Sequence, residues 1–209
     1  MAKTLNEQNL GGLVTILLAN FGVFVVLITT HVLAVPSLAS DPSTFVKPVL
    51  PAGIALIICG MVNRQVDSNT KARIVFWRWM DPLPGSRAFS KYGPEDPRIN
   101  MTVISSKLGP LPKTDREQNN AWFGLYKKVQ NEPAVLDAHR TFLLYRDYTF
   151  LSLLFLVVLT PIALWRVPIL STVGLYTLLL IGQFLLARNA AAERGRRFVT
   201  NVLAEYMGV

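Results

Sequence analysis

The sequence predicts an all-α integral membrane protein with four transmembrane helices and a helical cytoplasmic module inserted between helices 2 and 3. The first observation is the composition: 51% of the 209 residues are hydrophobic and only 16% are charged, whereas soluble domains contain about 25% charged residues. The second is the distribution, because the apolar runs lie near the two ends of the chain. The middle of the chain is ordinary polar sequence, which predicts a module outside the membrane.

The N-terminal pair of spans comes from two apolar runs. Residues 11–35 are long enough to cross a hydrocarbon core of about 30 Å, and they exceed the apolar stretch of a signal peptide, which is the competing interpretation. Residues 45–62 form the second candidate, with Lys47 and Pro48 expected at its outer end. We expect this helix to continue into the cytoplasm, with residues 75–80 as its cytoplasmic end.

The C-terminal pair of spans is predicted at residues 148–165 and 168–187. Only Arg166 and Val167 separate the two runs, so a tight helical hairpin is expected. Pro161 is a candidate kink in the third span.

The distribution of positive charge predicts the orientation. Of the 21 Lys and Arg residues, only Lys47 and Arg166 lie in the segments that follow the first and third spans. The positive-inside rule therefore places both termini and the module in the cytoplasm, and for a bacterial protein the membrane is the inner membrane. The predicted division is 1–63 for the N-terminal transmembrane pair, 64–147 for the cytoplasmic module, 148–187 for the C-terminal transmembrane hairpin and 188–209 for a cytoplasmic C-terminal helix.

Within the module, local signals predict three helices. A short helix is expected to begin with the cap-like pair Asp96-Pro97 and to end at Gly109. The pattern Thr114-x-x-Glu117 is a capping box and predicts the start of a second helix. The apolar face of that helix is formed by residues at spacings of three and four, namely Trp122, Leu125, Tyr126 and Val129. A third helix is expected to begin at Pro133 and to run into the third span without a break.

The C-terminal segment from Arg188 is expected to extend the fourth span. Ala187, Ala191 and Gly195 form a ridge of small residues at i, i+4 and i+8, which is typical of oligomer interfaces and equally of close packing within one subunit. An apolar stripe continues beyond the ridge, at Phe198, Val202 and Tyr206. This stripe needs a partner surface, either on the module or on a neighbouring protomer.

The search for catalytic motifs yields no candidate enzyme site. The chain has no phosphate-binding glycine loop, no zinc-protease motif and no nucleophile elbow. Its single cysteine, Cys59, lies in an apolar run and is expected to be a small buried group. His139 is the one candidate general base, but a histidine beside charged residues on a helix is more typical of a surface or interhelix hydrogen bond. We therefore predict a protein that is not an enzyme and that has no cofactor or metal.

Polar residues in the predicted spans are uncharged, which disfavours an ion-coupled transporter. Asn20, Thr29 and Thr30 are candidates to line a pore in a homo-oligomer, since one subunit of four spans cannot enclose a wide channel. The alternative is hydrogen bonding between helices.

The candidate anion site is the segment from Arg87 to Tyr92. Arg87 and Lys91 alternate with the aromatic residues Phe89 and Tyr92, a combination suited to phosphate pairing and base stacking. The net charge of +8 also favours anionic partners, including lipid headgroups. A solvated or lipid-facing surface is the alternative explanation for the same charges.

Three segments of the middle region carry a resemblance to known proteins: WMDPLPGSRAFSKYGPEDPRI, LGPLPKTDREQNNAWFGLYKKV and HRTFLLYRD. Over residues 77–147 the chain resembles poorly characterised bacterial multi-span proteins that accompany nucleotide-signalling anti-phage systems, such as the membrane effector of Hailong-type defence. The resemblance implies an oligomeric membrane effector that damages or depolarises the inner membrane when a nucleic-acid-like signal binds or is released. It implies no role for any individual residue.

The functional expectation is a homo-oligomeric inner-membrane effector in anti-phage defence, either a ligand-gated pore or a membrane-depolarising protein. Its expected ligand is a nucleotide or oligonucleotide, and a nucleotidyltransferase is the expected partner enzyme. The alternative is a membrane-anchored scaffold that recruits a soluble partner protein. A membrane-embedded lipid enzyme is a third hypothesis, disfavoured because clustered His, Asp and Glu residues are lacking.

Overall fold

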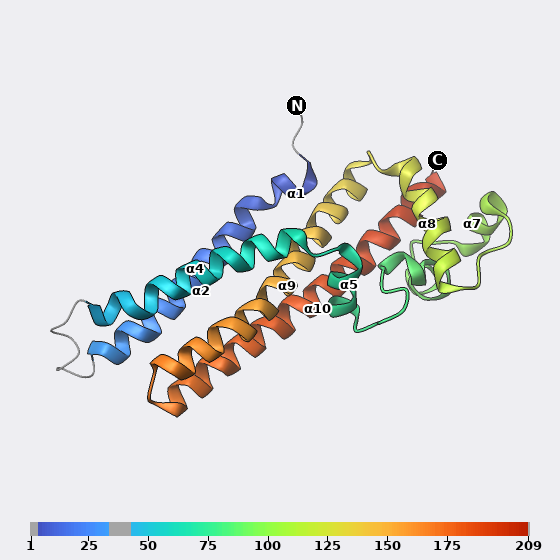
Figure 1. Ribbon diagram of the computed structural model, residues 1–209. Helices are drawn as coiled ribbons and strands as arrows, with labels where there is room; N and C mark the ends of the chain where they lie inside the picture. Colours follow the sequence, from blue (N-terminus) through green and yellow to red (C-terminus); the bar gives the residue numbers. More distant parts are fainter. Residues whose placement is uncertain (1–3, 34–42, 209) are drawn as a thin grey trace. The chain divides into compact units, whose positions relative to one another are not determined.

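The computed structural model describes residues 4–33 and 43–208, and every regular element in these ranges is helical (Figure 1). The elements follow in the order α1 (Leu5–Gln8), α2 (Leu10–Leu33), α4 (Ser43–Gln65), α5 (Ser68–Phe76), η1 (Pro84–Arg87), η2 (Ala88–Tyr92), α6 (Gly93–Glu95), α7 (Met101–Leu108), α8 (Asp115–Val129), α9 (Pro133–Arg166) and α10 (Leu170–Gly208). The all-α prediction is confirmed.

The long helices are those of a membrane protein. In the described part of the chain, three helices are long and apolar enough to cross a membrane: α2, α9 and α10. The number rises to four if α4 and α5 are counted as one broken span.

The chain divides into two compact units. We call Glu7–Val66 and Asp147–Ala187 the apolar unit, and Asp67–Arg146 with the chain from Arg188 onward the polar unit.

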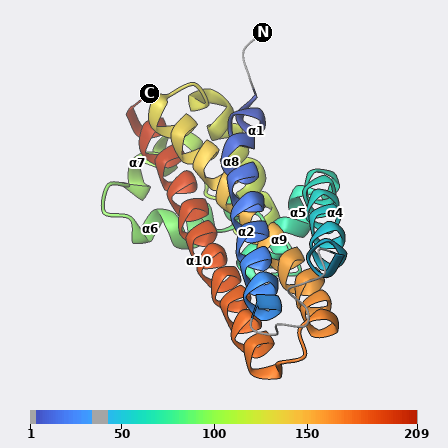
Figure 2. The same cartoon turned by 90° about the vertical axis from the view of Figure 1, so that its left-hand side faces the viewer.

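The apolar unit contains α2, α4 and the adjoining parts of α9 and α10. The hairpin of α9 and α10 is visible in both views, with the two helices side by side (Figure 2). The core draws on all four helices, with Phe24, Leu56, Phe155 and Tyr176 among its buried residues. Cys59 lies in this core and is 3% exposed, as expected for a small apolar group.

The second predicted helix ends earlier than expected. Helix α4 stops at Gln65, and Asp67 caps a new helix, because its Oδ1 accepts hydrogen bonds from the backbone N–H groups of Asn69 (2.8 Å) and Thr70 (3.0 Å). Helix α5 then ends at Phe76, and residue 77 takes a left-handed conformation with φ 51°. The prediction of one helix continuing to residues 75–80 is therefore wrong.

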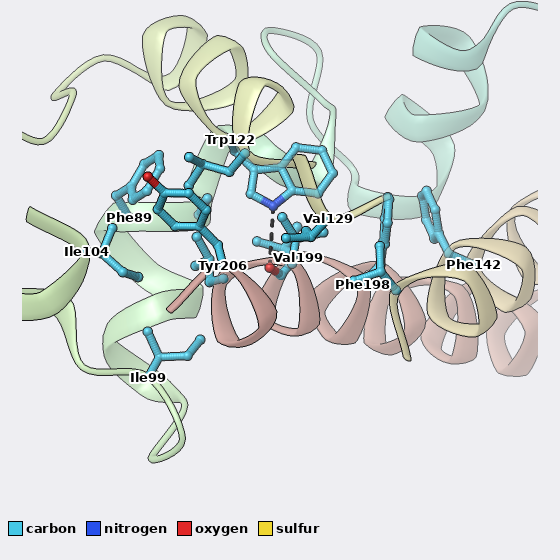
Figure 3. Close-up of a cluster of buried hydrophobic side chains, with 14 residues drawn as sticks. Phe89, Ile99, Ile104, Trp122, Val129, Phe142, Phe198, Val199 and Tyr206 are labelled. Atoms are coloured by element: carbon cyan, nitrogen blue, oxygen red, sulfur yellow. Dashed lines mark hydrogen bonds between the residues drawn. The ribbon is translucent and has the colours of Figure 1, made fainter. Parts of the chain in front are cut away.

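The polar unit has its own hydrophobic core, centred on Trp122 of α8 (Figure 3). The Trp122 ring is 5% exposed and meets Phe198 of α10 edge to face, with 5.1 Å between ring centroids. Its Nε1–H donates a hydrogen bond to the backbone oxygen of Val199 at 3.4 Å (Figure 3). Val202, Leu203 and the other buried residues of the C-terminal stripe complete this core. The partner surface that the stripe requires is thus the module itself.

The predicted helix starts in the module are confirmed with one exception. The Thr114 and Glu117 side chains form the capping box of α8, and α9 runs as one helix from Pro133. Helix α7 ends at Gly109, which has φ 84°, but its cap is Asn100 rather than Asp96.

Asp96 has a different role from the predicted cap. Its carboxylate accepts hydrogen bonds from Arg98, whose Nη2 also reaches Thr200 Oγ1 and Asn201 Oδ1 of α10, each at 3.2 Å. The hydrogen bond from Arg98 holds the pKa of Asp96 well below its ordinary value. These contacts connect the chain before α7 to the C-terminal helix.

Candidate functional site

The candidate site is a polar pocket of about 500 Å³ in the polar unit, within the usual size range of small-molecule sites. It is lined by side chains from α5, from the chain around η1 and from α8. The charged residues of the lining are Arg73, Arg116 and Asp81. Ser86, Asn119 and Asn120 contribute uncharged polar groups.

The first wall belongs to α5 and the loop that follows it. Arg73 is in the last turn of α5, and its Nε–H donates to the backbone oxygen of Trp79 at 3.2 Å. Trp77 and Asp81 have positive φ angles of 51° and 43°, an unusual conformation for residues other than glycine. Between them, Trp79 and Met80 are each 82% exposed and line the pocket. An aromatic ring and a cation therefore lie together at this wall.

The second wall is η1, which packs closely on α8. A Cβ atom added to Gly85 would lie 2.5 Å from the Trp122 ring and 2.7 Å from Asn119 Oδ1, so only glycine fits this approach. Gln118 fixes the adjacent turn, because its Oε1 accepts hydrogen bonds from the backbone N–H groups of Phe89 (3.1 Å) and Ser90 (3.0 Å). These contacts hold Ser86 at the pocket.

Ser86 is the least expected member of the site. It is 1% exposed, and its hydroxyl has no hydrogen-bond partner among the described residues. An unpaired buried polar group costs about 1–3 kcal/mol. The residue belongs to the lining of the pocket.

The pocket therefore has the chemistry of a binding site for an anion. Two guanidinium groups, a hydroxyl and several amides offer hydrogen-bond donors, and Asp81 offers acceptors. No group of three or more His, Cys, Asp and Glu side chains that could hold a metal ion occurs in the part of the chain that the structure describes.

The four residues predicted as the anion site lie elsewhere. Arg87 is 3.8 Å from Asp115, which also pairs with Arg78. Phe89 is buried at 5% exposure in the core of the polar unit, so its ring is not at the surface for base stacking. Lys91 is exposed.

Tyr92, the fourth predicted residue, is half-buried and packs on the same core. Burial raises the pKa of its hydroxyl, so this group stays neutral at physiological pH. The structure brings Arg73 and Arg116 together instead.

The predicted pore residues are only partly described. Asn20 is half-buried, and its Nδ2 donates to the backbone oxygen of Ile16 at 2.9 Å within the same helix. Thr29 and Thr30 belong to α2, but their side chains lie outside the described residues.

The ridge of small residues is covered within the chain. Ala187 is 2% exposed and Ala191 is fully buried. A Cβ atom on Gly195 would lie 2.7 Å from the Phe76 ring and 3.0 Å from the Phe142 ring. These observations favour the alternative of packing within one subunit over an oligomer interface.

His139 lies among aromatic rings of the polar unit. Its ring stacks on Phe198 with 4.5 Å between centroids, and Nδ1 is 3.1 Å from the Tyr126 hydroxyl. His139 therefore lies in hydrogen-bonding distance of a residue on another helix, which agrees with the expectation of an interhelix hydrogen bond.

The polar pocket residues missed by sequence reasoning are Arg73, Asp81, Ser86, Arg116, Asn119 and Asn120. One available signal was the Asn119-Asn120 pair, since asparagine is a poor residue for a helix interior and both lie within α8.

No protein-family model, no curated protein and no solved structure matches this chain.

Proposed function

We propose that the protein is a homo-oligomeric, non-enzymatic effector of the bacterial inner membrane, in which a ligand bound by the polar unit controls a pore or a membrane perturbation. The polar pocket is the observation that carries this proposal, because its two guanidinium groups and its side-chain amides suit a small anionic ligand. An anti-phage role and a partner nucleotidyltransferase belong to the same proposal and rest on the sequence resemblance.

Two structural features support control of the membrane by this unit. Helices α9 and α10 each contribute residues to both the apolar and the polar unit. A rearrangement of either helix in the polar unit would therefore alter a helix that crosses the membrane. In addition, all Lys and Arg residues lie in the polar unit except Lys3, Lys47, Arg64 and Arg166.

The direct test is conductance of the full-length protein in planar bilayers. We expect discrete current steps whose frequency changes when nucleotides or cell extracts are added on the side of the polar unit. Protein heated until it unfolds is the control. Absence of current under every ligand condition would contradict the pore, and co-purification of a stoichiometric soluble protein in that case would establish the scaffold.

The second candidate function is the membrane-anchored scaffold that recruits a soluble protein. The observation that favours it is the exposure of the Trp79 and Met80 side chains.

The proposed topology has four spans and places both termini in the cytoplasm. The single native cysteine, Cys59, allows a labelling test in a Cys59→Ala background. A membrane-impermeant maleimide added to intact spheroplasts is expected to label a cysteine at Arg166 and not one at Lys113, because the positive-inside rule puts them on opposite sides. Lys113 should become reactive after permeabilisation. Labelling of Lys113→Cys in intact spheroplasts would reverse the orientation.

A further inference from the structure

We infer that the polar pocket binds a phosphate group, held by Arg73 and Arg116 with the Ser86 hydroxyl as a third contact, and that the molecule carrying this phosphate also has a hydroxyl or amine. This inference rests on the proposed function and names the ligand chemistry of the same site. Two carriers share this chemistry: a small soluble phosphate ester and the headgroup of an anionic phospholipid.

The number of donors favours phosphate over carboxylate. A carboxylate presents two acceptor oxygens in one plane, whereas a phosphate monoester presents three strong acceptor oxygens and the phosphodiester of a lipid headgroup presents two charged oxygens and two ester oxygens around a tetrahedral centre. Arg73 has its Nε–H engaged with the Trp79 backbone, at 3.2 Å, which leaves its terminal N–H groups for a ligand. Arg116 is an exposed residue of the pocket lining. Guanidinium groups of this kind bind phosphate oxygens in pairs.

Ser86 provides an independent reason to expect a ligand. Its hydroxyl is buried and unpaired within the described chain, yet its residue lines the pocket. A rotation of the Ser86 side chain toward the pocket would let this hydroxyl donate to a phosphate oxygen, and binding would then satisfy a group that is otherwise without a partner in the described chain.

Asp81 restricts which phosphate compounds fit. Its carboxylate lies in the same lining as Arg73 and Arg116, so it repels a bare phosphate ion and accepts hydrogen bonds from a neighbouring donor. A ligand with a hydroxyl or amine near its phosphate satisfies both kinds of group. The exposed ring of Trp79 offers an apolar face for the rest of such a molecule.

The test uses full-length protein in nanodiscs of zwitterionic lipid, with glycerol 3-phosphate as the soluble probe and calorimetry as the readout. Because hydrogen bonds to charged groups contribute about 1.5–3 kcal/mol, we expect Arg116→Gln to weaken binding roughly 10-fold to 100-fold. Arg73→Gln should have a similar effect, and inorganic phosphate should bind more weakly than glycerol 3-phosphate. Ser86→Ala should weaken binding while raising the melting temperature of the unliganded protein.

The matched control is Lys127→Gln, which removes one positive charge from an exposed position on the same helix as Arg116. This variant should bind the probe like the wild type. Equal losses in Lys127→Gln and Arg116→Gln would mean non-specific attraction and would overturn the inference. So would loss of binding in Lys91→Gln with Arg116→Gln unaffected, since the anion would then occupy the segment from Arg87 to Tyr92.

A second arm identifies the carrier. Nanodiscs that contain phosphatidylglycerol should compete with glycerol 3-phosphate if the natural ligand is a lipid headgroup, and should leave its affinity unchanged if the ligand is soluble. Either result supports the phosphate site. Binding is measured without conductance, so a protein that binds the probe but never conducts contradicts only the proposed function. A conducting protein whose pocket binds neither probe contradicts only this inference.

Discussion

Replacing Leu203 with aspartate is expected to unfold the polar unit while the protein still inserts into the membrane. Leu203 is fully buried in the core of that unit, on the part of α10 that follows the apolar segment. The substitution removes a buried apolar side chain and buries an unpaired charge, and each change costs several kcal/mol. A total stability of about 5–15 kcal/mol is typical of a domain, so the loss removes most or all of it.

Limited proteolysis of the protein in nanodiscs measures this effect. The wild-type polar unit should resist trypsin, whereas Leu203→Asp should be cut rapidly between residues 67 and 146. The control is Arg197→Ala on the same helix, where the side chain is 58% exposed and pairs with Glu193, so its loss should cost less than about 1 kcal/mol. Resistance of Leu203→Asp equal to that of the wild type would show that the C-terminal helix does not complete the core.

Replacing Trp122 with alanine is expected to destabilise the polar unit by roughly 3–5 kcal/mol, the usual cost of removing a large buried aromatic side chain. Trp122 contacts Gly85 of η1 on one side and Phe198 of α10 on the other. The substitution would therefore remove the ring on which η1, the segment that carries Ser86, packs. Ligand binding should then fall together with the stability of the polar unit.

Two further variants make the Trp122 experiment specific. Trp122→Phe keeps most of the ring but removes the indole N–H that bonds to the Val199 oxygen at 3.4 Å, so we expect a loss of about 1 kcal/mol from the hydrogen bond plus a smaller packing term. Phe123→Ala changes the next residue, which is 49% exposed, and should leave stability nearly unchanged. Chemical denaturation of the polar unit, with proteolysis as the readout, should give the largest loss of stability for Trp122→Ala, a smaller loss for Trp122→Phe and the smallest for Phe123→Ala. A Phe123→Ala effect as large as that of Trp122→Ala would refute the assignment of Trp122 to the core.

Local signals in the sequence were sufficient for most of the helices. The capping box of Thr114 and Glu117 and the glycine after α7, Gly109 with its positive φ of 84°, each act within four residues, so their effect can be recognised without knowing the fold. The start of α5 was equally local, because Asp67 followed by Thr70 is a capping pattern. The apolar run before it favours one long helix, but the cap at Asp67 starts a new helix and so ends the second helix earlier than predicted.

The residues of the candidate site could not be predicted from local sequence signals. Its cations, Arg73 and Arg116, belong to helices far apart in the chain, and Ser86 lies between them on a short turn. In contrast, Arg87 and Lys91 are neighbours in the sequence, which made them conspicuous. Burial of Phe89 in the core depends on how η2 packs, and the contact of Arg87 with Asp115 depends on how η1 packs on α8. Spacing alone does not contain that information.

The sequence by itself determined the all-α class, the apolar composition of the membrane helices, the concentration of positive charge outside them, and the continuity of α9 and α10 beyond their apolar segments. Each of these follows from composition, periodicity or capping over short stretches. Only the tertiary structure decided that the C-terminal stripe closes the core of the polar unit and that Arg73, Ser86 and Arg116 share one pocket. The physical reason is that burial and convergence of side chains arise from packing between distant segments. The segment from residue 75 to residue 92 illustrates this division, because its basic character is evident in the sequence but the packing on α8 determines which of its side chains line the pocket.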